Sequence, residues 1–318
     1  RARVGSFGRT RHSSSPASRG EMSAASSSMR RAVARGLRLS ARGGATSCSR
    51  PEMLVTRGLS ASFSSSAGAR SASSPGLFEF RVCSVKPGAM DAYLAACASH
   101  AGTRARLEPG FLGAFRTSVG GDVNEITRVI AHADYDARDA AIAAMRADPA
   151  WTAFCDSTDP LIAHETSEMF LPATKCLEAV AGDSPSDADA EARWRDFFCS
   201  KSEKQQTNPG VFELRAYQLE LGYNPIPKLM EHMSKGLPSK LLSDTEKNGL
   251  LIGMFYSDVG RLNRFVEIWR YDSAKNHIAA REAARGAIEW RECVGNIAPM
   301  VQMFDTKLTS PTPCSPVQ

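Results

Sequence analysis

The chain has 318 residues, of which 42% are hydrophobic, and this is enough for about two domains with packed cores. The formal charge of +5 is uneven, because residues 1–75 hold thirteen Arg, no Lys and two acidic residues, a net charge of +11. Residues 76–318 therefore carry a net charge of −6 and lack the clustered Lys and Arg that phosphate binding needs. We expect no nucleic-acid partner for this body.

The sequence also argues against several kinds of site. The eight Cys form no CxxC pair and no cluster with His at zinc-ligand spacing, so we interpret them as free thiols. No glycine-rich phosphate loop and no nucleophile elbow around a serine occurs. No apolar run approaches the roughly 20 residues of a membrane helix. We therefore predict a soluble body with no metal, no cofactor and no transmembrane segment.

Residues 1–75 are rich in Arg, Ser, Ala and Gly and poor in acids, a composition typical of an organelle transit peptide. Within residues 29–42, arginines recur at helical spacing opposite an apolar face, which suits import across an inside-negative membrane. The stretch 57–61 (RGLSA) looks like a matrix-protease site, and we expect cleavage near Leu59 or Ser60. A disordered mitochondrial leader is predicted, with a plain disordered tail or a plastid leader as alternatives.

An internal repeat organises the rest of the chain. Phe78-Glu79-Phe80-Arg81 recurs as Phe212-Glu213-Leu214-Arg215. Five further matches follow in the same order: Gly88 with Gly222, Gly113-x-Phe115 with Gly253-x-Phe255, Val119-Gly120 with Val259-Gly260, Tyr135-Asp136 with Tyr271-Asp272, and Trp151 with Trp290. Six ordered matches indicate two copies of one domain.

Each copy opens with a strand in which apolar residues alternate with Glu and Arg, a period typical of a strand with one buried face. A helix follows, around residues 90–97 and 226–233. The expected later elements are strands at about 111–118 and 123–132 (250–257 and 262–271 in copy two), helical stretches at 137–158 (interrupted at Asp148-Pro149) and 273–297, and final strands at 163–170 and 300–308. The order β-α-β-β-α-β is that of the ferredoxin-like split unit.

The predicted fold class is therefore α+β, with two tandem ferredoxin-like (βαββαβ) domains. Each such domain leaves one sheet face bare, so we expect the copies to pack sheet to sheet as an α/β barrel. The expected segments are a disordered leader at 1–75, a first domain at 76–175, a linker with a short helix (191–198) at 176–208, a second domain at 209–310 and a disordered tail at 311–318.

These motifs resemble those of the NIPSNAP family. Residues 212–217 (FELRAY) are similar to its opening Tyr/Phe-Glu-Leu-Arg-x-Tyr strand, and Leu262-Asn263 with residues 268–271 resembles its Leu-Asn…Leu-Trp-x-Tyr strand. Arg281 stands where the family has a helix Arg, and residues 148–151 resemble its Asp-Pro-x-Trp helix break.

Copy two is the closer match. Copy one has Cys83 in place of Tyr217, and Ala133 where copy two has Trp269. The resemblance implies a dimeric α/β-barrel fold and a mitochondrial adaptor, in the matrix or associated with the inner membrane, without established catalysis. It also implies mitochondrial protein partners, such as an inner-membrane assembly, and we add a homo-oligomer as a further expectation.

The candidate ligand or family-motif positions all lie in copy two: Glu213, Arg215, Tyr217, His232, Asn263, Trp269, Tyr271, Arg281 and Trp290. Glu213 and Arg215 share a strand face and are expected to form an ion pair that is either exposed to solvent or at the barrel rim, with an anion clamp at Arg215 as the functional alternative. A haem site would need a His such as His232 beside an apolar pocket. Core packing is the simpler account of the aromatic residues.

We therefore predict a non-catalytic mitochondrial binding or scaffold protein. The alternative is a small-ligand, monooxygenase-like or haem-binding barrel enzyme with its pocket in the second domain, which rests on fold analogy alone. An inter-sheet space filled by apolar side chains would remove the enzyme hypothesis. A cavity of roughly several hundred Å³ reached by His232 or Arg215 would restore it.

Overall fold

The structure is a computed structural model that describes residues 76–181 and 209–318. The predicted leader with its cleavage site and the short helix at residues 191–198 lie outside the described residues. None of the helices within the described ranges is long and apolar enough to span a membrane.

The order of elements follows the predicted β-α-β-β-α-β pattern in each half of the body. The first half consists of β1 (Leu77–Val85), α1 (Met90–Ser99), α2 (Ala101–Leu107), β2 (Phe111–Val119), β3 (Glu125–His132), α3 (Tyr135–Ala147), α4 (Pro149–Thr158) and β4 (Ile162–Pro172), followed by α5 (Thr174–Ala181). The second consists of β5 (Val211–Leu219), α7 (Pro225–Ser243), β6 (Gly249–Val259), β7 (Arg264–Tyr271), α8 (Ala274–Gly286), α9 (Ile288–Ile297) and β8 (Val301–Pro311).

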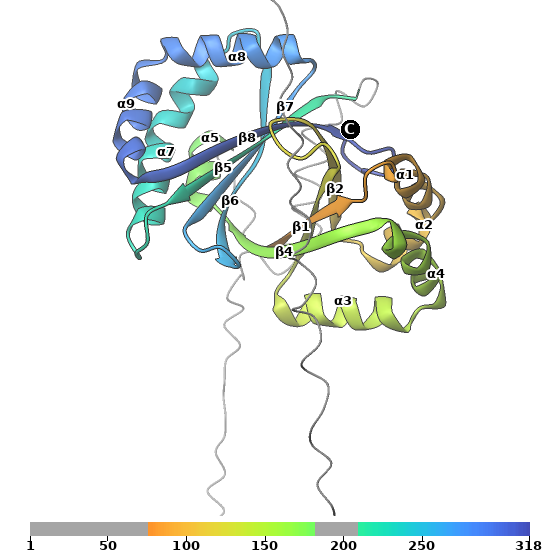
Figure 1. The fold of residues 1–318 in the computed structure, drawn as a ribbon. Helices are drawn as coiled ribbons and strands as arrows, with labels where there is room; N and C mark the ends of the chain where they lie inside the picture. Colours follow the sequence, from red (N-terminus) through yellow and green to blue (C-terminus); the bar gives the residue numbers. More distant parts are fainter. Residues whose placement is uncertain (1–75, 182–208) are drawn as a thin grey trace, which may run out of the picture. The chain divides into compact units, whose positions relative to one another are not determined.

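All eight strands form one closed antiparallel barrel in the order β1-β3-β2-β8-β5-β7-β6-β4 (Figure 1). The halves are hydrogen-bonded to each other twice, through β2 with β8 and through β4 with β6. The expected approach of the two sheets is therefore completed by pairing of their edge strands. Closure leaves no exposed strand edge in this barrel for another chain to pair with.

The interior of the barrel is filled by phenylalanine rings contributed by both halves. Phe78 lies 4.7 Å from Phe255 between ring centroids, and Phe115 lies 4.7 Å from Phe212. These four side chains are completely buried. Each half thus covers the apolar sheet face of the other half. We expected a barrel for this physical reason, because an apolar sheet face is stable only when it is covered.

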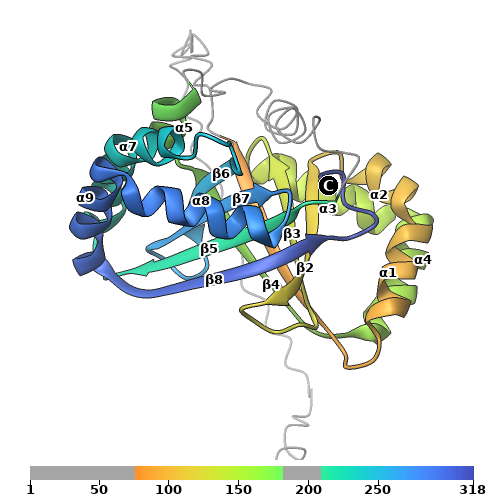
Figure 2. The same ribbon diagram turned by 90° about the horizontal axis from the view of Figure 1, so that it is seen from above.

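The helices lie outside the barrel, with α1–α4 on one side and α7–α9 on the other (Figure 2). The break at Asp148-Pro149 is confirmed, since the Asp148 carboxylate accepts a hydrogen bond from Ala150 N at 2.8 Å and Pro149 occupies the first helical position. The continuous helix expected at 273–297 is wrong. Ala287 adopts an extended conformation (φ −75°, ψ 117°) and separates α8 from α9 without any proline.

One match of the predicted repeat is out of register. Tyr271 is the last residue of β7 and pairs with Val211, whereas Tyr135 begins helix α3. The residue that pairs with Leu77 in the same way is His132, so His132 is the counterpart of Tyr271. By the same register Ile130, rather than Ala133, is the counterpart of Trp269, because Glu79 pairs with Ile130 and Glu213 pairs with Trp269.

The tail at 311–318 is ordered, so its predicted disorder is wrong. Thr312 N donates to Ala114 O at 2.8 Å, Val317 is fully buried, and Gln318 O accepts from Arg270 Nε at 2.9 Å. The tail therefore binds to strands of both halves. Its proline-rich sequence has no strand or helix period, which is why periodicity could not reveal this packing.

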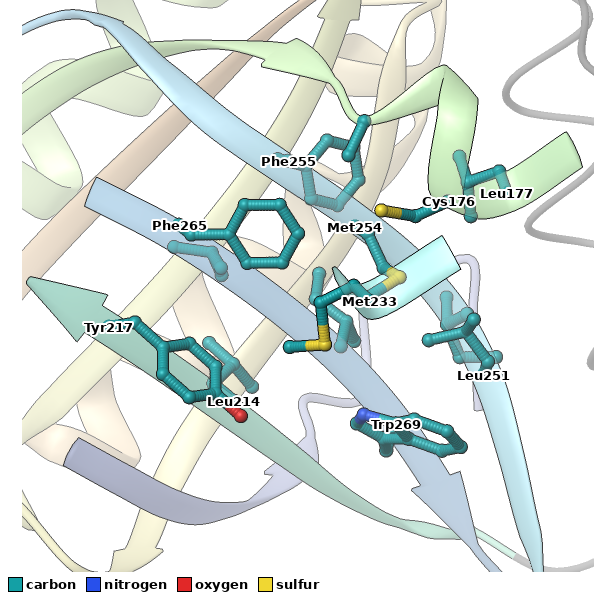
Figure 3. Packing of buried hydrophobic residues seen from close by; sticks show 14 of the residues in the cluster. Cys176, Leu177, Leu214, Tyr217, Met233, Leu251, Met254, Phe255, Phe265 and Trp269 are labelled. Atoms are coloured by element: carbon teal, nitrogen blue, oxygen red, sulfur yellow. The ribbon is translucent and has the colours of Figure 1, made fainter. Parts of the chain in front are cut away.

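The linker predicted to begin at residue 176 starts too early. Helix α5 continues to Ala181, and its Cys176 and Leu177 are buried beside Met254 and Phe255 of β6 (Figure 3). Cys176 also contacts α7, with its sulfur 3.5 Å from Met230 O. The apolar Cys-Leu pair covers one end of the core, so α5 belongs to the packed body.

Close packing of α7 against α9 predicts a steric effect at Gly236. A Cβ there would lie 2.5 Å from Cys293 Cβ and 2.9 Å from Glu289 O, whereas a Cβ on Gly295 in α9 meets nothing within 4 Å. Gly236→Ala should lower the free energy of unfolding by about 1–3 kcal/mol, measured by urea denaturation. Gly295→Ala, the control, should be neutral or stabilising by about 0.5–1 kcal/mol. Equal effects of the two substitutions would contradict this packing.

Candidate functional site

The candidate site is a cavity of about 760 Å³ in the second half, outside the barrel. It lies between helices α7, α8 and α9 and the outer faces of β5, β7 and β8. Its polar and aromatic walls are formed by Arg215, Tyr217, Lys240, Asp244, Trp269, Tyr271, Arg281, Arg285, Trp290, Arg291 and Phe304. The space inside the barrel is smaller, about 140 Å³ beside Phe80 and Phe170.

Strand β5 brings Glu213 and Arg215 beneath the helices. Alternation along the strand directs Leu214 to the apolar core and its two charged neighbours to the helical side. Glu213 is fully buried and Arg215 nearly so, with Arg215 Nη2 2.8 Å from Glu213 Oε2. The expected exposed ion pair is therefore wrong, because α7, α8 and α9 cover the face that strand periodicity alone assigns to solvent.

Glu213 is held as a carboxylate by its neighbours. Tyr271 OH donates to Glu213 Oε2 at 2.9 Å, and His277 Nε2 and Arg281 Nη1 lie 3.3 and 3.8 Å from Oε1. Burial alone would raise the pKa of Glu213, but Arg215, with smaller contributions from His277 and Tyr271, outweighs burial and lowers it. The negative charge thus remains in the layer between sheet and helices.

Lys240 of α7 reaches the same layer and was not among the predicted site residues. Its Nζ lies 3.7 Å from the ring centroid of Trp269 and 4.4 Å from that of Trp290. The nearest carboxylate oxygen, Glu267 Oε2, is 3.8 Å away and accepts a hydrogen bond from Trp269 Nε1 at 2.5 Å. Burial lowers the pKa of Lys240 to about 7, while Glu267 opposes this shift.

A sequence signal for Lys240 existed. It follows the buried Met233 and Leu237 at helical spacing, so it falls on the face of α7 that packs on the sheet. A lysine on a buried helix face is unusual and points to a specific environment.

The cavity wall carries more positive than negative side chains. Five of its lining residues are Arg or Lys, and Asp244 is the only acid among them in the part of the chain described. The Asp244 carboxylate is engaged by Asn248 Nδ2 and Gly249 N, each at 2.8 Å. Arg281 is partly exposed, and Arg291 forms no ion pair within the described segments. The wall can therefore attract an anion.

Six of the nine predicted positions line the cavity: Arg215, Tyr217, Trp269, Tyr271, Arg281 and Trp290. Glu213 lies directly behind them. Asn263 does not reach the cavity; it adopts a left-handed conformation (φ 57°), and its Nδ2 donates to Glu220 O and Gly222 O in the loops at one end of the second half. His232 is half-buried on α7 and also lies outside the cavity wall.

In the first half, Glu79 is the counterpart of Glu213, and its carboxylate has more hydrogen-bond partners from the protein. Glu79 accepts hydrogen bonds from Arg138 Nε at 2.9 Å, Arg81 Nε at 2.6 Å and Ser167 Oγ at 2.7 Å, and His132 Nε2 lies 3.3 Å away. Both carboxylate oxygens therefore have partners from the protein. The Glu79 carboxylate is thus satisfied by the protein alone, whereas Arg215 and Lys240 of the second half line a cavity.

The described ranges contain no group of three or more His, Cys, Asp or Glu side chains placed to hold a metal ion. None of the cavity-lining residues found there is a histidine.

The protein is a closed barrel of eight antiparallel strands flanked by helices. It has a ligand-sized cavity under the helices of its second half. The sequence model of the NIPSNAP family matches residues 78–176 and 212–316. These segments make up more than half of the chain, and the chain belongs to the NIPSNAP family.

Similar proteins include Protein NipSnap of Drosophila melanogaster, 27% identical over 113 residues, which are 36% of this chain and 39% of the fly protein. The chain thus matches about two fifths of the length of this relative. Among solved structures, a NIPSNAP-like domain protein from Burkholderia xenovorans is 29% identical, with a TM-score of 0.31, covering 34% of this chain and 90% of that one. A candidate monooxygenase from Lactobacillus acidophilus is 12% identical, with a TM-score of 0.49, covering 75% and 94%.

The Glu79 cluster predicts acid sensitivity. Burial alone would raise the pKa of Glu79, but His132, Arg138 and Arg81 hold it far below its ordinary value of 4.5. A depressed folded pKa adds stability that is complete above pH 4.5 and is lost as the pH falls below it. Glu79→Gln should therefore cost about 3 kcal/mol at neutral pH, and the gap to the wild type should narrow towards about pH 3.

Urea unfolding at both pH values measures this gap. Glu246→Gln, at an exposed glutamate between α7 and β6, serves as the control and should change stability little at either pH. A gap between wild type and Glu79→Gln that is independent of pH would contradict the assignment.

Proposed function

We propose that this NIPSNAP protein is a non-catalytic binding protein whose second-half cavity holds a small amphipathic anion, an aromatic or alkyl carboxylate. The observation that carries the proposal is the cavity of about 760 Å³ with aromatic walls and arginine side chains. Small-molecule sites have volumes of about 300–1,000 Å³ and combine apolar walls with few polar groups.

The aromatic walls suit the apolar part of such a ligand. Trp269 and Trp290 come from the sheet and from α9, and Tyr217 stacks on Phe304 with ring centroids 4.5 Å apart at the cavity rim. Phe304 is 44% exposed, so part of this aromatic surface is in contact with water. A ligand that covers it would remove apolar area from solvent.

The arginines suit the carboxylate. Arg281 leaves 42% of its side chain exposed, and its guanidinium is 3.8 Å from Glu213 Oε1, beyond hydrogen-bond distance. A guanidinium with unused donors binds a carboxylate in a bidentate manner. Arg215 is already paired with Glu213. It also lines the cavity and adds to the positive charge of the wall.

One observation favours the enzyme alternative and another argues against it. A cavity reached by Arg215 exists, but it lies on the helical side of the sheet, and the space between the two halves is filled by phenylalanine rings. A haem axial ligand from histidine has no candidate among the described lining residues, and His232 is outside the cavity. These observations favour ligand binding over haem or barrel-interior chemistry.

The finer organisation is part of the same proposal. Two tandem ferredoxin-like domains, the first extended by α5 and the second by the packed tail, are supported by the repeated order of elements and by the two separate family matches. A mitochondrial location rests on the arginine-rich composition of residues 1–75. Mitochondrial protein partners, such as an inner-membrane assembly, remain a prediction from the family resemblance, and a homo-oligomer remains a separate prediction.

Fusion of residues 1–75 to a fluorescent reporter tests the location. The fusion should enter mitochondria when the membrane potential is intact, because the arginine face responds to an inside-negative potential. A fusion with Arg31, Arg35, Arg38 and Arg42 replaced by Gln is the control and should remain outside. Cytosolic or plastid fluorescence of the unmodified fusion would contradict the proposal.

Calorimetric titration with 3-phenylpropionate tests the ligand class. The wild-type protein should bind the acid and bind the uncharged 3-phenylpropionamide at least about tenfold more weakly, since the amide lacks the charge that Arg281 contacts. Arg281→Gln should weaken binding of the acid about tenfold.

Arg146→Gln is the matched control, because Arg146 occupies the last turn of α3, outside the cavity wall. It should leave the affinity unchanged. Equal affinity of the wild type for the acid and the amide would contradict an anion site.

A further inference from the structure

We propose that Cys97 and Cys314 form a reversible disulfide when the protein meets a hydroperoxide, with Cys314 as the thiol that reacts first. This site lies in the first half, away from the cavity, so the inference does not depend on the proposed function.

A turn in the C-terminal tail brings Cys314 to the helices of the first half. Thr312 N donates to Ala114 O of β2 at 2.8 Å, and Ser315 N donates to Thr312 O at 2.9 Å. Within this turn Cys314 packs on the apolar cluster that contains Cys97 of α1. Both ribbon views show the dark blue C-terminal segment beside these helices (Figures 1 and 2).

Helix α1 presents Cys97 to this turn. Its buried residues Met90, Tyr93 and Cys97 recur at helical spacing on one face. A hydrogen bond joins the thiol groups of Cys97 and Cys314, and both thiols are free. A disulfide needs two cysteines whose side chains face each other at close range. These two meet that condition, although they are far apart in the sequence.

The surroundings of Cys314 favour its reaction with an oxidant. The hydrogen bond from Cys97 lowers the pKa of Cys314 below its ordinary value of 9.0, as do Thr312 and Arg104, while burial opposes them. Thr312 Oγ1 lies 3.4 Å from Cys314 Sγ. The thiolate is the nucleophilic form of cysteine. Cys314 is half-buried whereas Cys97 is 5% exposed, so an oxidant reaches Cys314 first.

The second half has no thiol at the position that corresponds to Cys97. Helix α7 buries Ile226, Leu229 and Met233 at the spacing of the three buried residues of α1, so Met233 is the counterpart of Cys97. Its thioether packs with the sulfur 4.0 Å from Cys293 Sγ and cannot form a disulfide. Packing at this helix position therefore does not require a thiol, and the thiol pair of the first half calls for a chemical explanation.

The proposed step balances with the hydroperoxide as the oxidant. The Cys314 thiolate attacks the terminal peroxide oxygen, the O–O bond breaks, and the leaving oxygen takes up the proton that Cys314 had released. The products are a sulfenic acid and an alcohol, or water from hydrogen peroxide. The sulfur of Cys97 then attacks that of Cys314, an S–S bond forms, and the hydroxyl leaves as water with the Cys97 proton. Two thiols lose two electrons, which the peroxide accepts.

The disulfide would fasten the tail that connects the two halves. Beyond Cys314 the tail buries Val317, and Gln318 O accepts from Arg270 Nε of β7 at 2.9 Å. A covalent link to α1 closes a long loop that includes most of both halves, and such a loop restricts the unfolded chain. Oxidation should therefore raise the Tm by about 5 °C or more.

Peroxide treatment of the full chain tests the inference. The protein is treated with hydrogen peroxide at neutral pH, the remaining thiols are blocked with iodoacetamide, and linked peptides are identified by mass spectrometry. We expect one dominant peptide pair that joins Cys97 to Cys314, together with the rise in Tm. Dithiothreitol should reverse both.

Two variants and one control complete the experiment. Cys314→Ser and Cys97→Ser should each remove the linked peptide and the rise in Tm, and either variant that keeps a cooperative unfolding transition is sufficient. Cys155→Ser alters another half-buried cysteine that packs on the same apolar cluster, and it should form the link as the wild type does.

Three results would overturn the inference. The first is a set of linked peptides that joins other cysteines and omits the Cys97–Cys314 pair. The second is oxidation of Cys314 to a sulfinic acid while Cys97 is recovered in its alkylated form. The third is an unchanged Tm after the link has formed, because a tail fastened to α1 must restrict the unfolded chain.

Discussion

The architecture depends on one packing constraint, the contact of phenylalanine rings from the two halves inside the closed barrel. Phe78 packs on Phe255 and Phe115 on Phe212, so each half covers the apolar sheet face that the other would expose. These rings also occupy the space in which a ligand of the barrel would sit. Room for a small molecule is therefore found where helices meet the sheet, and in the second half that layer opens into the cavity of about 760 Å³.

The two halves show two solutions for burying charge between helices and a sheet. Burying a carboxylate is costly unless it is paired and hydrogen-bonded. In the first half, Arg81, Arg138 and Ser167 satisfy Glu79 from the protein itself. In the second, Glu213 and Glu267 each keep an oxygen without a hydrogen bond within the described chain. The Glu79 carboxylate is satisfied by the protein alone, whereas the buried charged groups of the second half lie next to a cavity lined by arginines.

Much of this fold could be predicted from the sequence, because period-2 alternation and the repeat at Phe78 and Phe212 report directly on strands and their apolar faces. The depth of burial of Glu213 and Arg215 could not, since alternation does not say what covers the second face of a strand. The ordered tail was missed because its packing depends on Ala114 and Arg270, which are distant in sequence. Lys240 was missed because its environment is created by two tryptophans, Trp269 and Trp290, brought together only by the fold.

The central claim is that the protein accommodates small anions under the helices of its second half rather than inside its barrel. A crystal structure of the protein soaked with 3-phenylpropionate tests it most directly. The account predicts ligand density in the cavity under α7, α8 and α9, with its apolar part next to Tyr217 and Phe304 and its carboxylate directed to Arg281 or Arg291. Density inside the barrel beside Phe80 and Phe170, with the cavity under α7 and α9 left empty, would contradict it.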